Sequence, residues 1–188
     1  MALKREEFRS QLTQIRPSQL VFVDESGAQT NLTRRAGRAP KGERLVDAVP
    51  NGHYQVTTMI GAIRLRGLTA GLIFEGPTDT EAFATFVEQI LVPQLRRGDV
   101  VVMDNLSSHK SQRIATALEK VGATLWYLPP YSPDFNPIEK MWSKLKSRIR
   151  GTAARTRLTL WNAIGKAWKT VQPQEIQAYF RSCGINAT

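Results

Sequence analysis

Apolar residues gather in short runs along the chain, and two of these runs share a pattern. Residues 20–23 and residues 100–103 are each four consecutive apolar side chains, most of them β-branched. Such runs predict short strands that are covered on both faces of a sheet. Asp24 and Asp104 directly follow the two runs. We therefore expect each strand to present a carboxylate at its end.

Three further stretches predict strands. Residues 54–63 and 68–74 predict two strands joined by a short turn, and this pair should extend the sheet that begins at Leu20. Residues 124–128 predict the last strand. Residues 27–52, which are rich in glycine and charged side chains, are typical of a loop.

Helices are predicted between the strands. Thr78 and Glu81 have the spacing of a capping box, and apolar residues recur behind them at helical intervals. A helix should therefore begin at about Asp79. A second helix should open near Ser108, capped by the serines there, and end at Gly122.

A longer helical pattern follows a proline-rich loop. Asn136 is suited to cap this helix, and Pro137 is suited to its first turn. Glu139 lies about 100° around the helix from Ile138, at the rim of the apolar face. The predicted apolar face comprises Ile138, Met141, Trp142, Leu145 and Ile149.

Both ends of the chain are predicted to contain helices. Residues 1–18 should form an N-terminal arm or short helix, and two helices should follow the longer one, around residues 160–171 and from Pro173 onward. Trp161 and Trp168 belong to the first of these two helices. We interpret them as core residues rather than a platform for stacked bases. The order of elements is typical of an α/β fold, a mixed sheet flanked by helices on both faces.

Asp24, Asp104 and Glu139 come from three separate elements and can converge on one point. Their carboxylates would repel one another unless a divalent cation neutralised them, and oxygen ligands suit Mg²⁺ or Mn²⁺. Each acid alone has a simpler explanation. The aspartates could merely end strands, and Glu139 stands where a capping-box glutamate would bond to the Asn136 amide.

A family resemblance favours the metal site. Between Asp104 and Glu139 lie 34 residues (105–138), and the similarity extends from about residue 19 to about residue 150. Three segments resemble the catalytic domain of DDE transposases of the mariner superfamily, most closely its bacterial insertion-sequence branch, in which this spacing is typical: residues 128–139, the Asp104-Asn105 pair with His109, and Asp24-Glu25-Ser26.

The resemblance implies a ribonuclease-H-like fold, in which the first strand lies beside the strand of the second aspartate. It implies that Asp24, Asp104 and Glu139 are the catalytic acids and bind two Mg²⁺ or Mn²⁺ ions. Asn105 and His109 would lie beside these ligands or contact a phosphate. A histidine in the first turn of a helix is an equally good explanation of His109.

Other kinds of site find less support in the sequence. One cysteine and two distant histidines provide no zinc cluster, and no P-loop for ATP is present. Ser107 and Ser108 lack the Gly-x-Ser-x-Gly context of a hydrolase nucleophile. Neither Glu25 nor Asp134 matches a triad position. Alternation would turn Glu25 to the other face of a continuing strand, and Asp134 suits a turn.

The composition is that of a globular protein. The chain has 188 residues, 41% of them hydrophobic and 22% charged, which is enough for one domain with its own core. The single cysteine, Cys183, excludes an internal disulfide and fits a reducing compartment. No stretch approaches the length of a membrane span, and residues 1–7 lack the apolar core of a signal peptide. We expect a cytoplasmic, nucleoid-associated protein.

The net charge of +10 is unevenly distributed. Residues 1–139 carry 16 Lys and Arg against 15 Asp and Glu, whereas residues 140–188 carry 10 against one. This asymmetry predicts nucleic acid as a partner. For the basic residues of the loop, a solvated turn is an equally good explanation. The candidate DNA contacts lie in the loop and on the helix of Glu139: Arg34, Arg35, Arg38, Lys41, Lys140, Lys144 and Arg148.

The resemblance implies the catalytic domain of a cut-and-paste DNA transposase, and the excess of basic residues agrees with a DNA partner. Such a domain would hydrolyse a phosphodiester bond at the transposon end and then join the freed 3′-hydroxyl to target DNA. A non-catalytic DNA-binding remnant and a metal-dependent nuclease remain as alternatives. The resemblance implies helix-turn-helix modules ahead of the catalytic domain, and because only 23 residues precede Asp24, we expect such a module to be separately encoded. We also expect a homo-oligomer. We divide the chain into an arm (1–18), a ribonuclease-H-like catalytic domain (19–150) and a basic helical extension (151–188).

Overall fold

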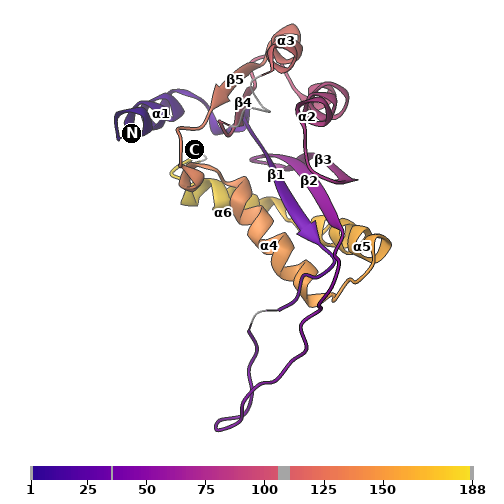
Figure 1. Ribbon diagram of the computed structural model, residues 1–188. Coiled ribbons are helices and arrows are strands. Elements are labelled where there is room, and N and C mark those ends of the chain that lie inside the picture. The colour runs from indigo at the N-terminus through magenta and orange to yellow at the C-terminus, as the bar shows by residue number, and fades with distance from the viewer. Residues whose placement is uncertain (1, 35, 106–110, 187–188) are drawn as a thin grey trace.

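The computed structural model, which describes residues 2–34, 36–105 and 111–186, contains one mixed sheet between layers of helices (Figure 1). The strands lie in the order β3-β2-β1-β4-β5. The pairs β1–β2 and β2–β3 are antiparallel, whereas β1–β4 and β4–β5 are parallel. The bounds of the strands are Leu20–Gln29 (β1), Val56–Arg64 (β2), Gly67–Glu75 (β3), Val100–Met103 (β4) and Thr124–Tyr127 (β5).

Helices cover both faces of the sheet. The segment after α2 continues as a π-helical turn, Val87–Leu91, and a 3-10 turn, Val92–Gln94. Single 3-10 turns, Pro17–Gln19 and Pro133–Phe135, precede β1 and α4. The bounds of the helices are Ala2–Gln14 (α1), Thr80–Phe86 (α2), Gln112–Lys120 (α3), Ile138–Gly151 (α4), Arg157–Trp168 (α5) and Pro173–Ser182 (α6).

The alternation of side chains along β1 produces two separate cores. Leu20 and Phe22 belong to the core that includes side chains of α1, α4, α5 and α6. Val21 and Val23 belong to the core formed with α2 and α3. All four side chains are fully buried. The prediction that this apolar run forms a strand buried on both faces is therefore confirmed.

The last three helices pack on one face of the sheet (Figure 1). The five residues predicted for the apolar face of α4 are all buried. Trp161 and Trp168 are partly buried in the same layer, and the Trp161 indole Nε1 donates a hydrogen bond to the Thr57 hydroxyl at 3.0 Å. Trp168 packs against the core, as predicted, whereas the core role of Trp161 stays a prediction. The predicted boundary at residue 150, between the catalytic domain and a helical extension, stays a prediction. In the structure, α5 and α6 share a core with β1.

β1 is longer than predicted. It pairs with β2 from Val21 opposite Arg64 to Gln29 opposite Val56, so the antiparallel partner holds it extended well beyond the apolar run. The prediction that Asp24 ends its strand was wrong, since Asp24 lies within β1. The long loop accordingly begins at Thr30 rather than at Gly27, and residues 30–34 and 36–55 extend away from the body of the protein (Figure 1).

Two predicted helix caps were also wrong. Asp79, not Thr78, caps α2, because its carboxylate accepts a hydrogen bond from the Ala82 amide at 2.7 Å. The helix expected to open near Ser108 begins at Gln112 and is capped by Ser111. Ser107 and Ser108 lie outside the described residues.

The sequence predicted no membrane-spanning helix. Within the described ranges, no helix is both long and apolar enough to cross a bilayer.

Candidate active site

A pocket of about 430 Å³ lies where β1, the end of β4 and the beginning of α4 meet. All three predicted acids line it, and so does the proline-rich loop before α4. The lining residues are Asp24, Asp104, Asn105, Leu128, Pro129, Pro130, Tyr131, Ser132, Pro133, Asn136 and Glu139.

The register of the parallel strands explains how the two aspartates approach each other. Phe22 of β1 is opposite Val102 of β4. Asp24 and Asp104 each follow two residues later, which keeps them level and on the same face. This is the face covered by α4, because Phe22 and Val102 share a core with its apolar side chains. The third acid, Glu139, lies in the first turn of α4.

Asp24 is a buried carboxylate among other acids. It is 7% exposed, and its Oδ2 accepts a hydrogen bond from the Trp142 indole Nε1 at 3.2 Å. Burial, and after it the negative charges of Glu139 and Asp104, raises the pKa of Asp24 to about 8. No lysine or arginine in residues 2–34, 36–105 and 111–186 forms an ion pair with it.

Glu139 is exposed at the pocket and does not cap its own helix. The Asn136 amide donates to the Pro133 carbonyl at 3.0 Å, so it is not available to a capping-box glutamate. The residue before α4 is Pro137, which provides no side-chain cap. The cap predicted for Asn136 was therefore wrong. Its side-chain Oδ1 is instead buried and has no hydrogen-bond partner in the described part of the chain.

The pocket fits a divalent cation in the chemistry of its donors. Three carboxylates and two amide side chains, those of Asn105 and Asn136, surround it, and hard cations such as Mg²⁺ and Mn²⁺ prefer oxygen ligands. Burial and the neighbouring acids raise the pKa of Asp24, and a cation bound beside it would offset this unfavourable burial. Among the described residues, however, no three His, Cys, Asp or Glu side chains are close enough together to hold one ion.

The other acids near the motifs have different surroundings. Glu25 is opposite Ile60, whose side chain lies in the α2–α3 core, so it points to the other face from Asp24. Asp134 forms an ion pair with Arg5 of α1 at 2.6 Å. His109 lies outside the described residues.

Two of the basic candidates, Arg34 and Arg148, meet at the far end of α4. Arg34 from the loop and Arg148 from α4 line a groove of about 450 Å³ together with Lys166 of α5. Arg34 and Arg38 also line a neighbouring cavity of about 800 Å³. Lys41 and Lys140 are exposed, and Arg35 lies outside the described residues.

Lys144 differs from the other basic candidates. Its Nζ forms an ion pair with Glu175 of α6 and donates to the Thr170 carbonyl at 2.7 Å. Lys144 therefore holds α6 against α4. The DNA contact predicted for it stays a prediction, but the ammonium already has two oxygen partners.

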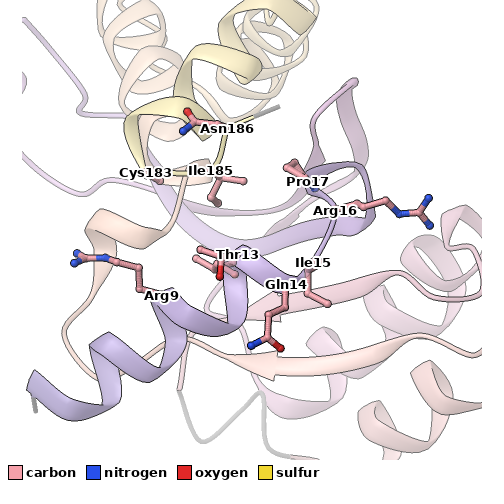
Figure 2. Close-up of a pocket in the computed structure, with 11 residues that line it drawn as sticks. Arg9, Thr13, Gln14, Ile15, Arg16, Pro17, Cys183, Ile185 and Asn186 are labelled. Carbon is pink, nitrogen blue, oxygen red and sulfur yellow. The ribbon is translucent and has the colours of Figure 1, made fainter. Parts of the chain in front are cut away.

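A second pocket, of about 380 Å³, lies between the end of α1 and the end of α6 (Figure 2). Arg9 of α1 and Arg16 of the turn after it line this pocket, together with Cys183 at the end of α6. Burial raises the pKa of the Cys183 thiol. This pocket has no carboxylate side chain in its lining, so it lacks the ligands that Mg²⁺ needs.

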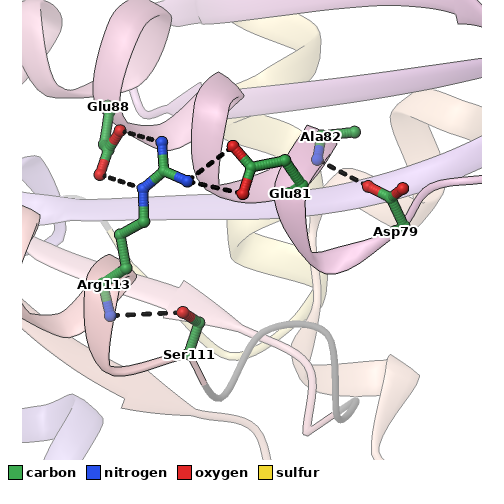
Figure 3. A network of polar contacts seen from close by, with 6 residues as sticks. All are labelled: Asp79, Glu81, Ala82, Glu88, Ser111 and Arg113. Atoms are coloured by element: carbon green, nitrogen blue, oxygen red, sulfur yellow. Dashed lines mark hydrogen bonds and ion pairs between the residues drawn. The ribbon is translucent and has the colours of Figure 1, made fainter.

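An exposed ion-pair network fastens α3 to the preceding helix (Figure 3). The Arg113 guanidinium binds both carboxylate oxygens of Glu81 and both of Glu88, all at 2.7 Å. The network lies outside the pocket, and it holds the helix that follows Asp104 in the chain.

The sequence has the same motifs as a known family. Residues 19–160 match the model of the DDE superfamily endonucleases. The chain belongs to this family. Two relatives are the Tcb1 transposase of Caenorhabditis briggsae, 29% identical over 111 residues, and the Tc1 transposase of Caenorhabditis elegans, 30% identical over 89 residues. These alignments cover 57% and 47% of this chain, but only 41% and 33% of the relatives, so the chain spans less than half their length.

Solved structures of Mos1 transposase have the same fold. The Mos1 strand transfer complex superimposes with a TM-score of 0.69 at 14% identity, covering 96% of this chain and 55% of that one. The Mos1 catalytic domain solved with raltegravir and Mg gives 0.62 at 13% identity, covering 98% and 86%. The predicted ribonuclease-H-like fold is thereby confirmed. The assignment to a bacterial insertion-sequence branch stays a prediction.

The sequence did not single out two side chains at this DDE-family pocket. Trp142 was assigned only to the apolar face of its helix, and Asn136 only to a cap. Trp142 lies one turn after Glu139, so its spacing could have suggested that it faces the same site. The buried Oδ1 of Asn136 depends on the loop conformation, for which the sequence offers no comparable signal.

Proposed function

We propose that this chain is the catalytic domain of a Tc1/mariner-type DNA transposase. It would hydrolyse a phosphodiester bond at each transposon end and then direct the freed 3′-hydroxyl to attack target DNA. One observation carries the proposal: three acids from three separate elements line one pocket in a chain whose residues 19–160 match the DDE endonucleases. Both Caenorhabditis relatives are named transposases, which supports the proposal.

Asp24, Asp104 and Glu139 would hold two Mg²⁺ or Mn²⁺ ions. When bound, such a pair activates an attacking oxygen and stabilises a leaving oxygen. The Mos1 catalytic domain has been solved with Mg and with Mn, which supports the same choice of ion here. Asp24 lies within β1 and Asp104 directly follows β4, so the two aspartates would provide the fixed side of the site.

Glu139 would provide the adjustable side. Its side chain is exposed in the first turn of α4, so it can rotate toward the two aspartates without moving the helix. A carboxylate there can also accept the proton of an attacking water. The proline-rich loop forms another wall of the pocket, and its two ends, Leu128 and Asn136, are buried and hold that wall in place.

DNA would run from the pocket along α4. Gly151 is the twelfth residue after Glu139, which corresponds to about 18 Å along the helix. The groove of Arg34, Arg148 and Lys166 lies at that distant end and would contact phosphates several nucleotides from the cleaved bond. The neighbouring structures include Mos1 paired-end complexes, and we extend from them the proposal that this chain acts as a homo-oligomer on two DNA ends.

The products of the reaction test the proposal. The purified chain, with any separately encoded reader of the same element, is incubated with labelled DNA that ends in the element's terminal repeat and with Mg²⁺ or Mn²⁺. Joined strand-transfer products are expected. Nicks at the repeat without joining would indicate a nuclease, and bound DNA without nicks would indicate a binding remnant. Asp104→Asn should abolish cleavage and leave DNA binding intact, because only the charge in the pocket changes.

The salt dependence of binding tests the basic groove. Each phosphate contact contributes about one unit to the slope of log K against log salt. Arg148→Ala and Lys166→Ala should therefore each reduce the slope by about one, whereas Lys4→Ala on the exposed surface of α1 should leave it unchanged. Equal slopes for all three variants would show that the groove does not contact the DNA backbone.

A further inference from the structure

A row of three residues crosses the sheet beneath the last helices. Asp24 of β1 is opposite Gly61 of β2, and Gly61 is opposite Gly71 of β3. The three residues therefore lie side by side across three strands, on the face that α4 and α5 cover. Two of the three have no side chain, so that face has room above them.

Two tryptophans occupy this room. A methyl group added to Gly61 would lie 2.8 Å from Cη2 of Trp142, and one added to Gly71 would lie 2.9 Å from Cη2 of Trp168. Both distances are closer than carbon atoms approach without displacement. Each indole thus lies directly on a glycine of the sheet, and each glycine is required by the ring above it.

The two indoles differ in what their N–H groups contact. Trp142 is 2% exposed, and its Nε1 donates to Oδ2 of Asp24 at 3.2 Å. Nε1 of Trp168 is buried without a hydrogen-bond partner among the described residues. The same arrangement of ring and glycine therefore orients a carboxylate at one position and only fills space at the other.

We propose that Trp142 is a positioning residue for Asp24, and that Gly61 allows the indole to reach it. The hydrogen bond fixes the orientation of the carboxylate, whose remaining lone pairs can bind a cation. Because Glu139 lies three residues before Trp142 on α4, the same contact also sets the position of Glu139 relative to Asp24. The inference rests on the metal-dependent function proposed above.

The first test removes the indole N–H and keeps an aromatic ring. Trp142→Phe in the full chain should weaken the binding of Mn²⁺ or Mg²⁺, measured by calorimetry without DNA, by roughly 10–100-fold, the usual effect of losing a group that orients a metal ligand. Trp161→Phe is the matched control, since it removes an indole hydrogen bond to Thr57 on the same face of the sheet. Its metal affinity should match that of the wild type. Equal affinities in the two variants would overturn the inference.

The second test uses the paired glycines. Gly61→Ala should displace the Trp142 ring and weaken metal binding, whereas Gly71→Ala should displace Trp168 and leave metal binding unchanged. Both variants introduce a similar steric conflict, so a general loss of packing would affect them alike. Metal affinities that fall equally in both would assign Trp142 a structural role only and overturn the inference.

A spectroscopic signal separates this inference from the proposed function. In ¹⁵N-labelled protein, the indole resonance that Trp142→Phe removes should shift when Mg²⁺ is added, and the resonance of Trp161 should not. A wild-type chain that binds no Mg²⁺ or Mn²⁺ would overturn the proposed function together with this inference. A wild-type chain that binds the ion while the Trp142 resonance stays fixed would overturn the inference alone.

Discussion

Asp24 and Asp99 are both buried, at 7% and 4% exposure, but their surroundings are opposite in charge. Asp99 precedes β4 and accepts hydrogen bonds from the Arg64 guanidinium at 2.9 Å and from the Arg96 amide at 2.8 Å. Asp24 accepts a hydrogen bond from the neutral Trp142 indole and one from the Glu25 backbone amide, and it shares its pocket with two more acids. One carboxylate is therefore neutralised by the fold, and the other is not.

The difference separates a structural acid from a ligand-binding one. Removing a carboxylate from water is unfavourable unless a positive charge or several donors replace the lost hydration. Arg64 does this for Asp99, whereas the unfavourable burial of Asp24 persists as a pKa raised to about 8. A buried acid that is left unneutralised beside other acids is typical of a functional site. Asp24 is thus destabilising in the protein alone, and a bound cation would compensate it.

Replacing each aspartate in turn by asparagine should have very different effects on activity, and this is the largest expected difference. Asp24→Asn should reduce metal-dependent DNA cleavage by roughly 10³-fold or more, the scale observed when one member of a catalytic group is lost. Asp99→Asn should cleave at nearly the wild-type rate at temperatures where it stays folded. Rates are measured on the same labelled DNA after circular dichroism has established that each variant is folded. Similar losses in both would remove the distinction between the two acids.

For stability, the larger loss is expected from Asp99→Asn, the variant that should keep its activity. Asp99→Asn leaves the Arg64 guanidinium, which is 12% exposed, without its counter-charge. The free energy of unfolding should fall by about 3 kcal/mol, as when one partner of a buried ion pair is removed. For a chain of this size that lowers Tm by roughly 6–12 °C. Thermal melts in metal-free buffer measure it, and an unchanged Tm would show that Arg64 is already satisfied by the Gln94 carbonyl.

The sequence predicted one of these acids and not the other, for a physical reason. Asp24 follows an apolar run and belongs to a motif, so local pattern and family resemblance both identified it. The partner of Asp99 is Arg64, 35 residues earlier on another strand, and only the folded sheet brings the two together. The hydrogen bond between Trp142 and Asp24 spans 118 residues and likewise has no local signal.

The range of the sequence signal also explains which features of the strands and helices were predicted correctly. The strand cores and the buried face of α4 follow from side-chain periodicity, which is local. The extension of β1 through Gln29 does not, because residues 25–29 are mostly polar or small and are held extended by pairing with β2. Pairing between distant strands also determines that Asp24 lies opposite Gly61, which no local pattern contains.

The pH dependence of stability should reveal Asp24 directly. Its pKa is about 8 in the folded protein and near 3.8 when unfolded, so folding takes up a proton between these values. The contribution of Asp24 to stability is therefore most favourable below about pH 4 and declines as the pH rises toward 8. Asp24→Asn removes this dependence and should be more stable than the wild type by on the order of 2 kcal/mol at pH 8.

Urea titrations of both proteins from pH 5 to pH 8 measure this difference. Asp99→Asn serves as the control, because its loss of stability should not follow the same curve. Addition of Mg²⁺ or Mn²⁺ at pH 8 should stabilise the wild type and not Asp24→Asn. A wild-type stability that rises toward pH 8 in the absence of metal would contradict the buried, acid-surrounded environment of Asp24.

An exposed ion pair extends the comparison to its weakest case. Arg113 binds Glu81 and Glu88 through four short contacts, and Glu88 has a lowered pKa chiefly because of its hydrogen bond to that guanidinium (Figure 3). Water already solvates all three groups, so the network gains little from its geometry. Arg113→Met should lower Tm by no more than about 2 °C, and less in high salt. Thermal melts at two salt concentrations measure this. If the loss equalled that of Asp99→Asn, the number of contacts rather than burial would determine how strongly an ion pair stabilises this protein.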